Sequence, residues 1–282
     1  MPLRWNFSSR ARALSEADAI VVSIPKSGRT WMRTFLCAYY CKRYDRAMTL
    51  EPERYGEPGI PRLVYSHDRF EQRTKGGRFW DRVRGKYLVP ASALRRARVI
   101  LLVRDPRDAF VSLHIQLTRR TRETPEALKQ TTPSELLRDQ NFGIASMIEV
   151  MNGWLTEFSD RPNFAFVRYE TLRADPEKNF RELLAAIGDA SPQAEAYQHA
   201  LAFSDFENMR KLEAGGAFDS KILQPGDVGD AESFKVRRGK VGGYRDYLTA
   251  ADQEYAARAM RRLDPRFEYK KRLTQPDALP VD

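Results

Sequence analysis

Two short segments of this chain combine backbone amides, hydroxyl groups and cationic side chains in a way that suits an anionic ligand. The first is SIPKSGRTW, residues 23–31, which follows an apolar run. Free N–H groups at a helix start, the positive end of the helix dipole and the Lys26 ammonium group would converge there on one anion. The segment therefore predicts a phosphate-binding loop.

The order of residues in this loop disfavours a nucleoside triphosphate as ligand. The phosphate loop of ATPases has the pattern GxxxxGK[ST], in which the lysine follows the glycines and the hydroxyl residue binds magnesium. Here Lys26 precedes Gly28, the only glycine of the segment. A small-molecule kinase of related fold is therefore the weaker alternative among enzymes.

The second segment is RDPRDAFVS, residues 104–112. Arg104 ends an apolar run, and Ser112 lies about two turns into the amphipathic stretch that follows. Both residues can face the carboxyl edge of a parallel sheet, where ligands of open α/β folds bind. The alternative is that the arginines and aspartates of this segment pair with one another at the surface.

Hydrophobic patterning places both segments between a strand and a helix. Short apolar runs rich in β-branched residues predict buried strands at 19–25, 98–104 and 163–169. Amphipathic stretches predict helices at about 30–42, 106–118, 134–158 and 176–187. Strands that alternate with helices predict an α/β fold, in which helices flank a central parallel sheet on both faces.

Length and composition favour one soluble domain. The 282 residues are 42% hydrophobic, and we expect a single domain over 1–282 with its core at about 19–269. The net charge of +10 favours an anionic ligand. The 36 Arg against 12 Lys fit bidentate anion recognition or a coding bias of the source organism. Composition alone gives no reason to expect nucleic-acid binding.

The cysteines and the N-terminal segment bear on metal content and location. Cys37 and Cys41 share one helix face and cannot form a four-ligand zinc site by themselves, so we expect them to pack in a reducing compartment and expect no metal. The first 20 residues lack the apolar run of a secretory signal, and no run of about 18 apolar residues occurs. We therefore expect a cytoplasmic protein without a transmembrane segment.

Three ordered motifs of this chain resemble those of the cytosolic-type sulfotransferases. PKSGRTW is similar to their 5′-phosphosulfate loop, PKSGTTW, and RDPRDAFVS to their 3′-phosphate motif, RNPKDxxVS. FKVRRGKVGGYRDYLT, residues 234–249, resembles RKGxxGDWKxxFT. With YETLRADP at 169–176 and SDFENM at 204–209, the resemblance extends from about Ala19 to Tyr269.

The resemblance implies a sulfotransferase/nucleoside-kinase-like fold with a P-loop-like phosphosulfate-binding loop. It also implies that the sulfuryl group of 3′-phosphoadenosine 5′-phosphosulfate (PAPS) passes in line to a hydroxyl or amine of a small-molecule, glycan or lipid acceptor, releasing PAP without a metal. It places cofactor contacts at Lys26, Ser27, Gly28, Arg29, Thr30, Trp31, Arg104, Ser112, Tyr169, Phe206, Arg237, Arg238 and Gly239.

Within that set the resemblance implies different roles. Lys26 would stabilise charge on the leaving phosphate, and its loop would bind the same phosphate through backbone amides. Arg104, Ser112 and residues 237–239 would bind the 3′-phosphate, a dianion suited to guanidinium groups. Trp31, Tyr169 and Phe206 would surround the adenine, although packing in the core is the ordinary alternative for buried aromatic residues.

His67 is the candidate catalytic base. A histidine titrates near neutrality, and this one follows the apolar run PRLVY, so it can lie at a strand end. YSHDR also resembles the family segment KTHLP, whose histidine is the base. His114 faces another side of its helix from Ser112, and His199 falls in a late helix. A catalytically silent nucleotide or polyanion-binding module, the alternative outside enzymes, would not need His67.

The chain departs from the family pattern at four positions. Arg29 replaces a threonine, Tyr65 a lysine, Gly243 an aspartate and Tyr244 a tryptophan. The lysine lost at Tyr65 would share the transition-state charge, and our hypothesis is that Arg29 takes over part of that task.

Other surface features leave alternatives open. Residues 245–254 nearly match the family's dimer motif KxxxTVxxxE, so a homodimer and an ordinary helix surface are equal alternatives. The irregular stretches 119–133 and 215–243 are either loops that cover a ligand or plain connections. Arg119, Arg120 and Arg122 fit an anionic acceptor or solvated charge equally well.

Overall fold

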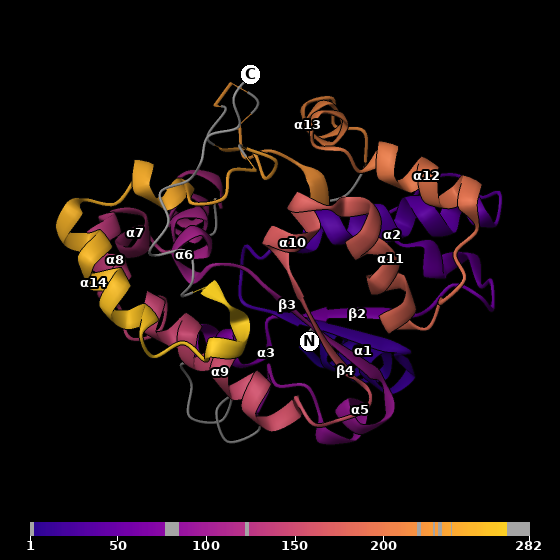
Figure 1. The fold of residues 1–282 in the computed structure, drawn as a ribbon, viewed down its shortest axis with the longest axis horizontal. Helices are drawn as coiled ribbons and strands as arrows, with labels where there is room; N and C mark the ends of the chain where they lie inside the picture. Colours follow the sequence, from indigo (N-terminus) through magenta and orange to yellow (C-terminus); the bar gives the residue numbers. More distant parts are fainter. Residues whose placement is uncertain are drawn as a thin grey trace.

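A sheet of four parallel strands runs through the middle of the computed structural model (Figure 1). The structure describes residues 3–76, 85–121, 124–218, 221–227, 229–230, 233–237 and 239–269. The strand order is β2-β1-β3-β4, and the strands are β1 (Ala19–Ser23), β2 (Leu63–Ser66), β3 (Arg98–Val103) and β4 (Phe164–Arg168). The three predicted strands are confirmed as β1, β3 and β4. The sequence analysis described β2 only as the apolar run that precedes His67.

The strand order creates a crevice at the carboxyl edge of the sheet. From β1 the chain crosses to β2 on one side, and β3 then lies on the other side of β1. Val22 pairs with Ser66 of β2 and Leu101 of β3, so the three strands end near one level. Segments that leave β1 and β3 therefore start side by side, as expected for ligand sites of open α/β sheets.

Helices cover both faces of the sheet (Figure 1). They are α1 (Leu3–Glu16), α2 (Arg29–Arg43), α3 (Asp68–Lys75), α5 (Ala91–Arg96), α6 (Pro106–Ile115), α7 (Glu126–Lys129), α8 (Pro133–Arg138), α9 (Ile144–Phe158), α10 (Tyr169–Ala174), α11 (Pro176–Ile187), α12 (Ala194–Phe203), α13 (Phe206–Ala214) and α14 (Ala250–Met260). A π-helical turn, Gln116–Arg120, continues α6. Short 3-10 turns occur at Pro52–Tyr55, Lys221–Leu223, Gly243–Asp246 and Pro265–Phe267.

Alternate strand residues face the two helical layers, as the period of two in a strand requires. Val21 and Ile100 belong to the buried cluster that includes Phe35 of α2 and Leu184 of α11. Their neighbours, such as Val22 and Leu101, belong to the other cluster, with residues of α6 and α9. The chain therefore has the predicted α/β architecture, with a parallel sheet between two layers of helices.

One predicted helix is wrong in its extent. The segment 134–158 forms two helices, α8 and α9, with a break between them. The Asp139 carboxylate accepts hydrogen bonds from the backbone N–H groups of Asn141 and Phe142, which offers the chain an alternative to helical bonding. A Cβ on Gly143 would lie 2.3 Å from the Asp139 carbonyl oxygen, so this tight turn requires glycine.

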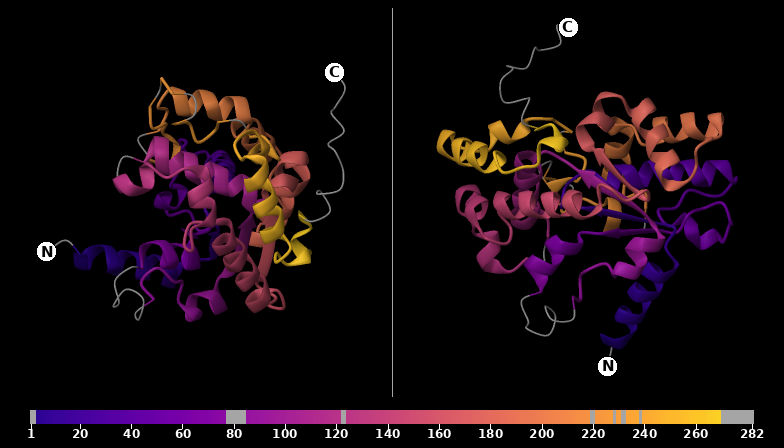
Figure 2. Two further views of the ribbon diagram at one scale, coloured as in Figure 1. Left: turned by 90° about the vertical axis from the view of Figure 1, so that its left-hand side faces the viewer. Right: turned by 60° about the horizontal axis from the view of Figure 1, so that its bottom comes forward.

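The N-terminal segment forms a helix that the sequence did not predict. Figure 2 shows α1, in indigo, at the periphery of the molecule. The Arg10 guanidinium donates hydrogen bonds to the Ser66 hydroxyl at 3.2 Å and to the Tyr87 carbonyl at 3.0 Å, so α1 is tied to the end of β2.

The structure also bears on the cysteines, on membrane-spanning helices and on the two irregular stretches. Cys37 and Cys41 are free and buried in α2, which confirms their packing role. Among the described residues, no helix is both long and apolar enough to cross a bilayer. The stretch 119–133 contains the short helix α7, and the described parts of 215–243 contain only isolated turns.

Candidate functional site

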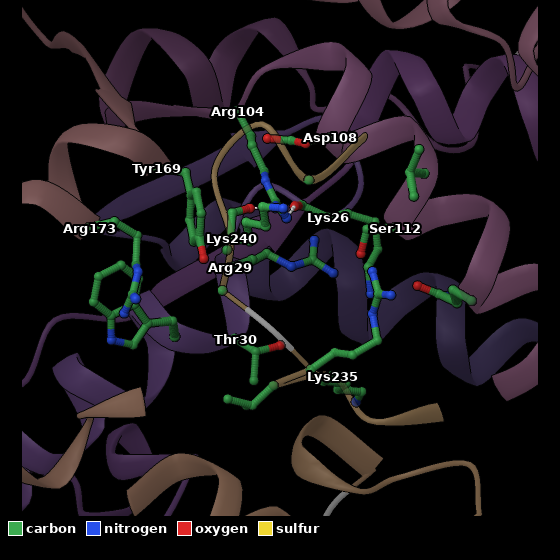
Figure 3. Close-up of a pocket in the computed structure, with 18 of the residues that line it drawn as sticks. Lys26, Arg29, Thr30, Arg104, Asp108, Ser112, Tyr169, Arg173, Lys235 and Lys240 are labelled. Atoms are coloured by element: carbon green, nitrogen blue, oxygen red, sulfur yellow. Dashed lines mark hydrogen bonds between the residues drawn. The ribbon is translucent and has the colours of Figure 1, made fainter. Parts of the chain in front are cut away.

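A cavity of about 290 Å³ opens at the carboxyl edge of the sheet (Figure 3). It collects residues from the loops after β1 and β3, from helices α6, α10 and α13, and from the late segment 235–247. The lining residues are Lys26, Gly28, Arg29, Thr30, Trp31, His67, Arg104, Asp108, Val111, Ser112, Gln116, Arg120, Tyr169, Arg173, Phe206, Met209, Lys235, Val236, Arg237, Gly239, Lys240, Gly243, Tyr244 and Tyr247.

The loop between β1 and α2 has the geometry of an anion site. Gly28 precedes α2 with φ at 93°, a left-handed conformation that favours glycine, and Lys26 also has a positive φ of 68°. A Cβ on Gly28 would lie 2.5 Å from a ring carbon of Tyr169. The loop therefore bends sharply beside Tyr169 and presents the start of α2, with its free N–H groups, to the cavity.

Arg104 comes from the neighbouring loop and lies over the same aromatic ring. One terminal nitrogen donates to the Lys26 carbonyl at 3.1 Å, and the guanidinium lies 4.5 Å from the centre of the Tyr169 ring. Its Nε is buried without a hydrogen-bond partner in the described structure. Such an unpaired donor costs about 1 to 3 kcal/mol, and an anion that accepted a hydrogen bond from Arg104 Nε would remove this cost.

The sequence analysis gave one alternative for residues 104–112, in which their arginines and aspartates pair with one another at the surface. The structure does not show such a surface cluster. Arg107 pairs with Asp105, but both side chains are buried. Asp108 accepts hydrogen bonds from the backbone N–H groups of Gly242 and Tyr244, at 2.7 and 2.9 Å. Asp108 thus holds the turn at residues 242–244 against α6, and Arg104 lines the cavity.

Aromatic side chains form one side of the cavity. The Trp31 indole N–H donates to the Ser204 carbonyl at 2.8 Å, and its ring meets Tyr169 edge to face at 5.9 Å between centroids. The Arg173 guanidinium lies 5.7 Å from the Trp31 ring and 5.5 Å from the Phe206 ring. Trp31 is therefore both packed into the protein and exposed to the cavity, and Arg173 adds a cation between two aromatic rings.

His67 lies directly after β2 at the start of α3. Its Nδ1 is 2.9 Å from the Ser23 carbonyl oxygen, which can only accept, so Nδ1 carries the proton and Nε2 keeps its lone pair. Burial, aided by the positive charge of Arg29, lowers the pKa of His67 to about 3. The imidazole is therefore neutral at physiological pH, in a tautomer whose Nε2 can accept a proton.

Cations crowd the cavity around Lys26. Burial lowers the pKa of Lys26 well below its ordinary value, and the charges of Arg120, Lys235 and Arg104 lower it further. Burial and Arg120 likewise lower the pKa of Lys235 to about 8. Figure 3 shows Lys26 beside Arg104, with Arg29 close by and Lys235 on the far side of Thr30. This concentration of positive charge favours a ligand with several negative charges.

A buried carboxylate holds the segment that carries Lys235. Glu213 of α13 is fully buried and accepts hydrogen bonds from the backbone N–H groups of Lys235 and Val236, at 2.7 and 2.9 Å. Gly239, with φ at 60°, follows at a point where a Cβ would lie 2.9 Å from the Phe206 ring. The late segment is thereby fixed against α13 at the mouth of the cavity.

Most side chains that the sequence assigned to the site line this one cavity. Ser27 does not, because it is buried and its hydroxyl donates to the Ile24 carbonyl. Arg238 lies outside the described residues. Tyr65 does not line the cavity either, and its ring packs under Arg33 at 4.6 Å. The roles of the assigned residues stay predictions.

Several lining residues escaped the sequence analysis. Asp108, Gln116, Arg173, Lys235 and Lys240 line the cavity, although the sequence analysis assigned none of them to the site. All except Gln116 lie inside recognised segments, namely RDPRDAFVS, YETLRADP and FKVRRGKVGGYRDYLT, which was the available signal. Grouped His, Cys, Asp and Glu side chains that suit a metal ion are absent from the described part of the chain.

Comparison with known proteins identifies relatives over nearly the whole chain. A family model described as the sulfotransferase domain matches residues 16–271. Human sulfotransferase 2B1 is 25% identical, with 91% of this chain and 68% of that protein covered. The 3-alpha-hydroxysteroid sulfotransferase of Cavia porcellus is 26% identical, with 86% and 81% covered. Cytosolic sulfotransferase 16 of Arabidopsis thaliana is 23% identical, with 86% and 73% covered.

Solved structures show the same fold at lower identity. Mouse sulfotransferase SULT7A1 in complex with PAP has a TM-score of 0.58 at 19% identity, with 91% of this chain and 89% of that chain covered. A retinol dehydratase with androsterone and the inactive cofactor PAP also has a TM-score of 0.58, at 17% identity, with 92% and 81% covered.

Proposed function

The chain belongs to the sulfotransferase domain family, whose model matches residues 16–271, and we propose that its cavity binds PAPS and transfers the sulfuryl group to an acceptor. One observation carries the proposal: the loop after β1, Arg104 after β3 and His67 after β2 meet around a single cavity. A binding module would explain the first two groups and leave the placement of His67 unexplained.

The donor would span the cavity between the two anion sites. The 5′-phosphosulfate would lie on the loop Lys26 to Thr30 at the start of α2. The 3′-phosphate would bind Arg104, Ser112, Arg237 and the Gly239 amide, and would satisfy the buried Nε of Arg104. Support for the adenine position comes from Trp31 and Phe206, which line the cavity on either side of Arg173.

The transfer step needs a proton acceptor and a stabilised leaving group. The acceptor oxygen or nitrogen would form a bond to sulfur while the bond from sulfur to the 5′-phosphate oxygen breaks, and PAP leaves with that electron pair. Nε2 of His67 would take the proton of the attacking group, at a gain of about 10² to 10⁴ in rate. Lys26 would stabilise the charge that develops on the leaving phosphate.

Arg29 is well placed to share that charge. The position of the family's second lysine is Tyr65, whose ring packs away from the cavity under Arg33. Arg29 lines the cavity, and its charge acts on His67. We therefore keep the hypothesis that Arg29 compensates for the missing lysine. Arg29→Ala would then lower turnover by about tenfold or more, as for other groups that stabilise developing charge, and unchanged turnover would rule the compensation out.

Two variants separate donor binding from transfer. His67→Asn should lose transfer of labelled sulfate from PAPS by at least about 10²-fold and retain PAP binding, because the base acts only on the acceptor. Arg104→Ala should lose the preference for PAP over adenosine 5′-phosphate, which lacks the 3′-phosphate, in calorimetric titrations. Each variant is the control for the other. Transfer that survives in His67→Asn would remove His67 from the mechanism.

The acceptor is proposed as a small molecule with a hydroxyl or amine group. The relatives named above include one hydroxysteroid sulfotransferase, and one solved structure contains androsterone. A screen of phenols, alcohols and amines with labelled PAPS would identify the class of acceptor. Failure of the wild-type protein to bind PAP would instead contradict the donor site itself.

A further inference from the structure

The cavity contains more positive charge than the proposed donor uses. Eight of its lining residues are Lys or Arg, and a single lining residue among those described, Asp108, is acidic. Asp108 is occupied by two backbone N–H groups. Lys240 pairs with Asp246, whereas Arg120 belongs to neither proposed phosphate site and has no carboxylate within ion-pair distance in the described ranges. Arg120 can therefore contact a second anionic group in the cavity.

Arg120 reaches the cavity along the same helical row as the proposed 3′-phosphate ligand. Ser112, Gln116 and Arg120 all line the cavity and are spaced four residues apart. The turn from Gln116 to Arg120 is π-helical, closed by a bond from the Thr121 N–H to the Gln116 carbonyl. Such wide turns are frequent at functional sites. At the rise of about 1.5 Å per residue of an α-helix, eight residues correspond to about 12 Å, so Arg120 lies well beyond Ser112 along the row.

The surroundings of Arg120 keep its charge directed at the cavity. It is half-buried, and no carboxylate in the described ranges comes within ion-pair distance of its guanidinium. The carboxylate that influences it is Glu213, which is already bound to two backbone N–H groups. A Cβ on Gly226 would lie 2.8 Å from the Arg120 Cγ, so the overlying loop packs tightly on this side chain.

Lys235 lies in the late segment 235–247 and lines the same cavity as Arg120. Its ammonium donates to the Ile222 carbonyl at 2.7 Å, and its backbone is held by Glu213. Arg120, Lys235 and Lys26 line the same cavity, and the charges of the first two lower the pKa of Lys26 further than burial does alone. Because Lys26 marks the phosphosulfate end of the proposed donor, an acceptor that approaches the sulfuryl group enters the cavity that Arg120 and Lys235 also line.

We propose that Arg120 and Lys235 bind a carboxylate, sulfate or phosphate group on the acceptor, so that the enzyme selects small anionic acceptors. This inference rests on the proposed sulfuryl transfer and deepens it. The neighbouring arginines of the sequence do not share the role, since Arg119 is exposed beside Asp230 and Arg122 lies outside the described residues.

The test compares acceptors that differ only in charge. The probes are three pairs: 4-hydroxyphenylacetate and its methyl ester, glycerol 3-phosphate and glycerol, and glucuronate and glucose. Their binding to the PAP-saturated enzyme is measured by calorimetry, and their sulfation with labelled PAPS. In at least one pair the anion should bind about 10- to 100-fold more tightly, the range expected for hydrogen bonds to a charged group.

Variants assign the preference to Arg120. Arg120→Gln should reduce the anion preference to near onefold and leave the affinity for PAP unchanged, while Arg120→Lys should retain part of the preference. Arg119→Gln, an exposed neighbour outside the cavity, is the matched control and should retain all of it.

Three results would overturn the inference. They are the absence of a preference for the anion in all three pairs, a preference that persists in Arg120→Gln, and a loss of PAP affinity in that variant as large as the loss for the acceptor. The last result would assign Arg120 to the donor. Failure of the wild type to bind PAP would contradict the proposed function instead, so the two failures are distinguishable.

Discussion

At the scale of single residues, the environment of His67 determines its chemistry. The Ser23 carbonyl fixes the proton on Nδ1, and burial beside Arg29 keeps the ring neutral. A neutral imidazole with a free Nε2 is the form that a base requires at the start of a reaction. A donor bound at Arg29 would bring negative charge close to the ring and stabilise the imidazolium that forms during transfer.

The first prediction concerns the titration of His67. In the empty enzyme its pKa of about 3 lies below the unfolded value of about 6.5, so the unfolded state binds the extra proton between these pH values. His67 therefore contributes stability above pH 6.5 that is lost as the pH falls toward 3. Saturation with PAP should raise the pKa, because the nucleotide offsets the charge of Arg29.

Nuclear magnetic resonance of labelled histidine measures this pKa with and without PAP. His67→Asn assigns the signal, since the chain has three histidines. A ring that titrates near pH 6.5 in the empty enzyme, or a pKa that falls when PAP binds, would contradict the role of burial and of Arg29.

At the scale of elements, the site depends on loops that are fixed by contacts far apart in sequence. The loop after β1 bends at Gly28 against Tyr169 of α10. The loop after β3 is tied through Asp108 to the turn at 242–244, and α13 is tied through Glu213 to the segment at 235–236. The ends of the three strands determine where these loops begin. The buried carboxylates of Asp108 and Glu213 hold the late segment at the cavity.

The second prediction tests the loop after β1 with two glycines. A left-handed conformation costs a residue with a Cβ about 1 to 2 kcal/mol. Gly56→Ala should show only this cost, because nothing lies within 4 Å of the added Cβ. Gly28→Ala adds a clash with Tyr169 and should also lower the affinity for PAP by about tenfold or more.

Thermal unfolding and PAP titration of both variants check this prediction. Equal stabilities and equal PAP affinities in the two variants would show that the close approach of Gly28 to Tyr169 has no part in forming the site.

At the scale of the whole molecule, the chain concentrates positive charge at one edge of the sheet. The net charge of +10 is spread over the sequence, but eight basic side chains line the cavity at this edge. Burial, and then the charges of neighbouring cations, lower the pKa of Lys26 and of Lys235, so the cavity disfavours the charged form of both side chains. An anionic ligand removes this repulsion.

The third prediction is that PAP stabilises the folded protein strongly and in a salt-dependent manner. A ligand at 100 times its dissociation constant stabilises the native state by about 2.7 kcal/mol. The Tm measured by differential scanning calorimetry should therefore rise with PAP, and the dissociation constant should increase with salt because the contacts are electrostatic. Arg104→Ala should show a smaller rise, and Arg119→Gln should match the wild type. A shift in Tm that is independent of salt would contradict an electrostatic origin.

The sequence by itself determined the framework and the donor motifs. Strands β1, β3 and β4 and helices α2 and α11 lie where the apolar patterns predicted them, because side-chain periodicity is a local property of the chain. Since parallel strands end at a common edge, the loops that follow them had to meet there. The meeting of Lys26, Arg104 and His67 around one cavity follows from these facts.

Only the tertiary structure decided which other side chains face that cavity. Arg120 ends the π turn and lines the cavity, and Glu213 fixes the segment of Lys235. The ring of Tyr65 packs under Arg33 and does not line the cavity. The break between α8 and α9 also depends on local competition from the Asp139 carboxylate. These side-chain orientations and helix ends depend on contacts between residues far apart in sequence or on side-chain hydrogen bonds. Hydrophobic periodicity predicts neither of them.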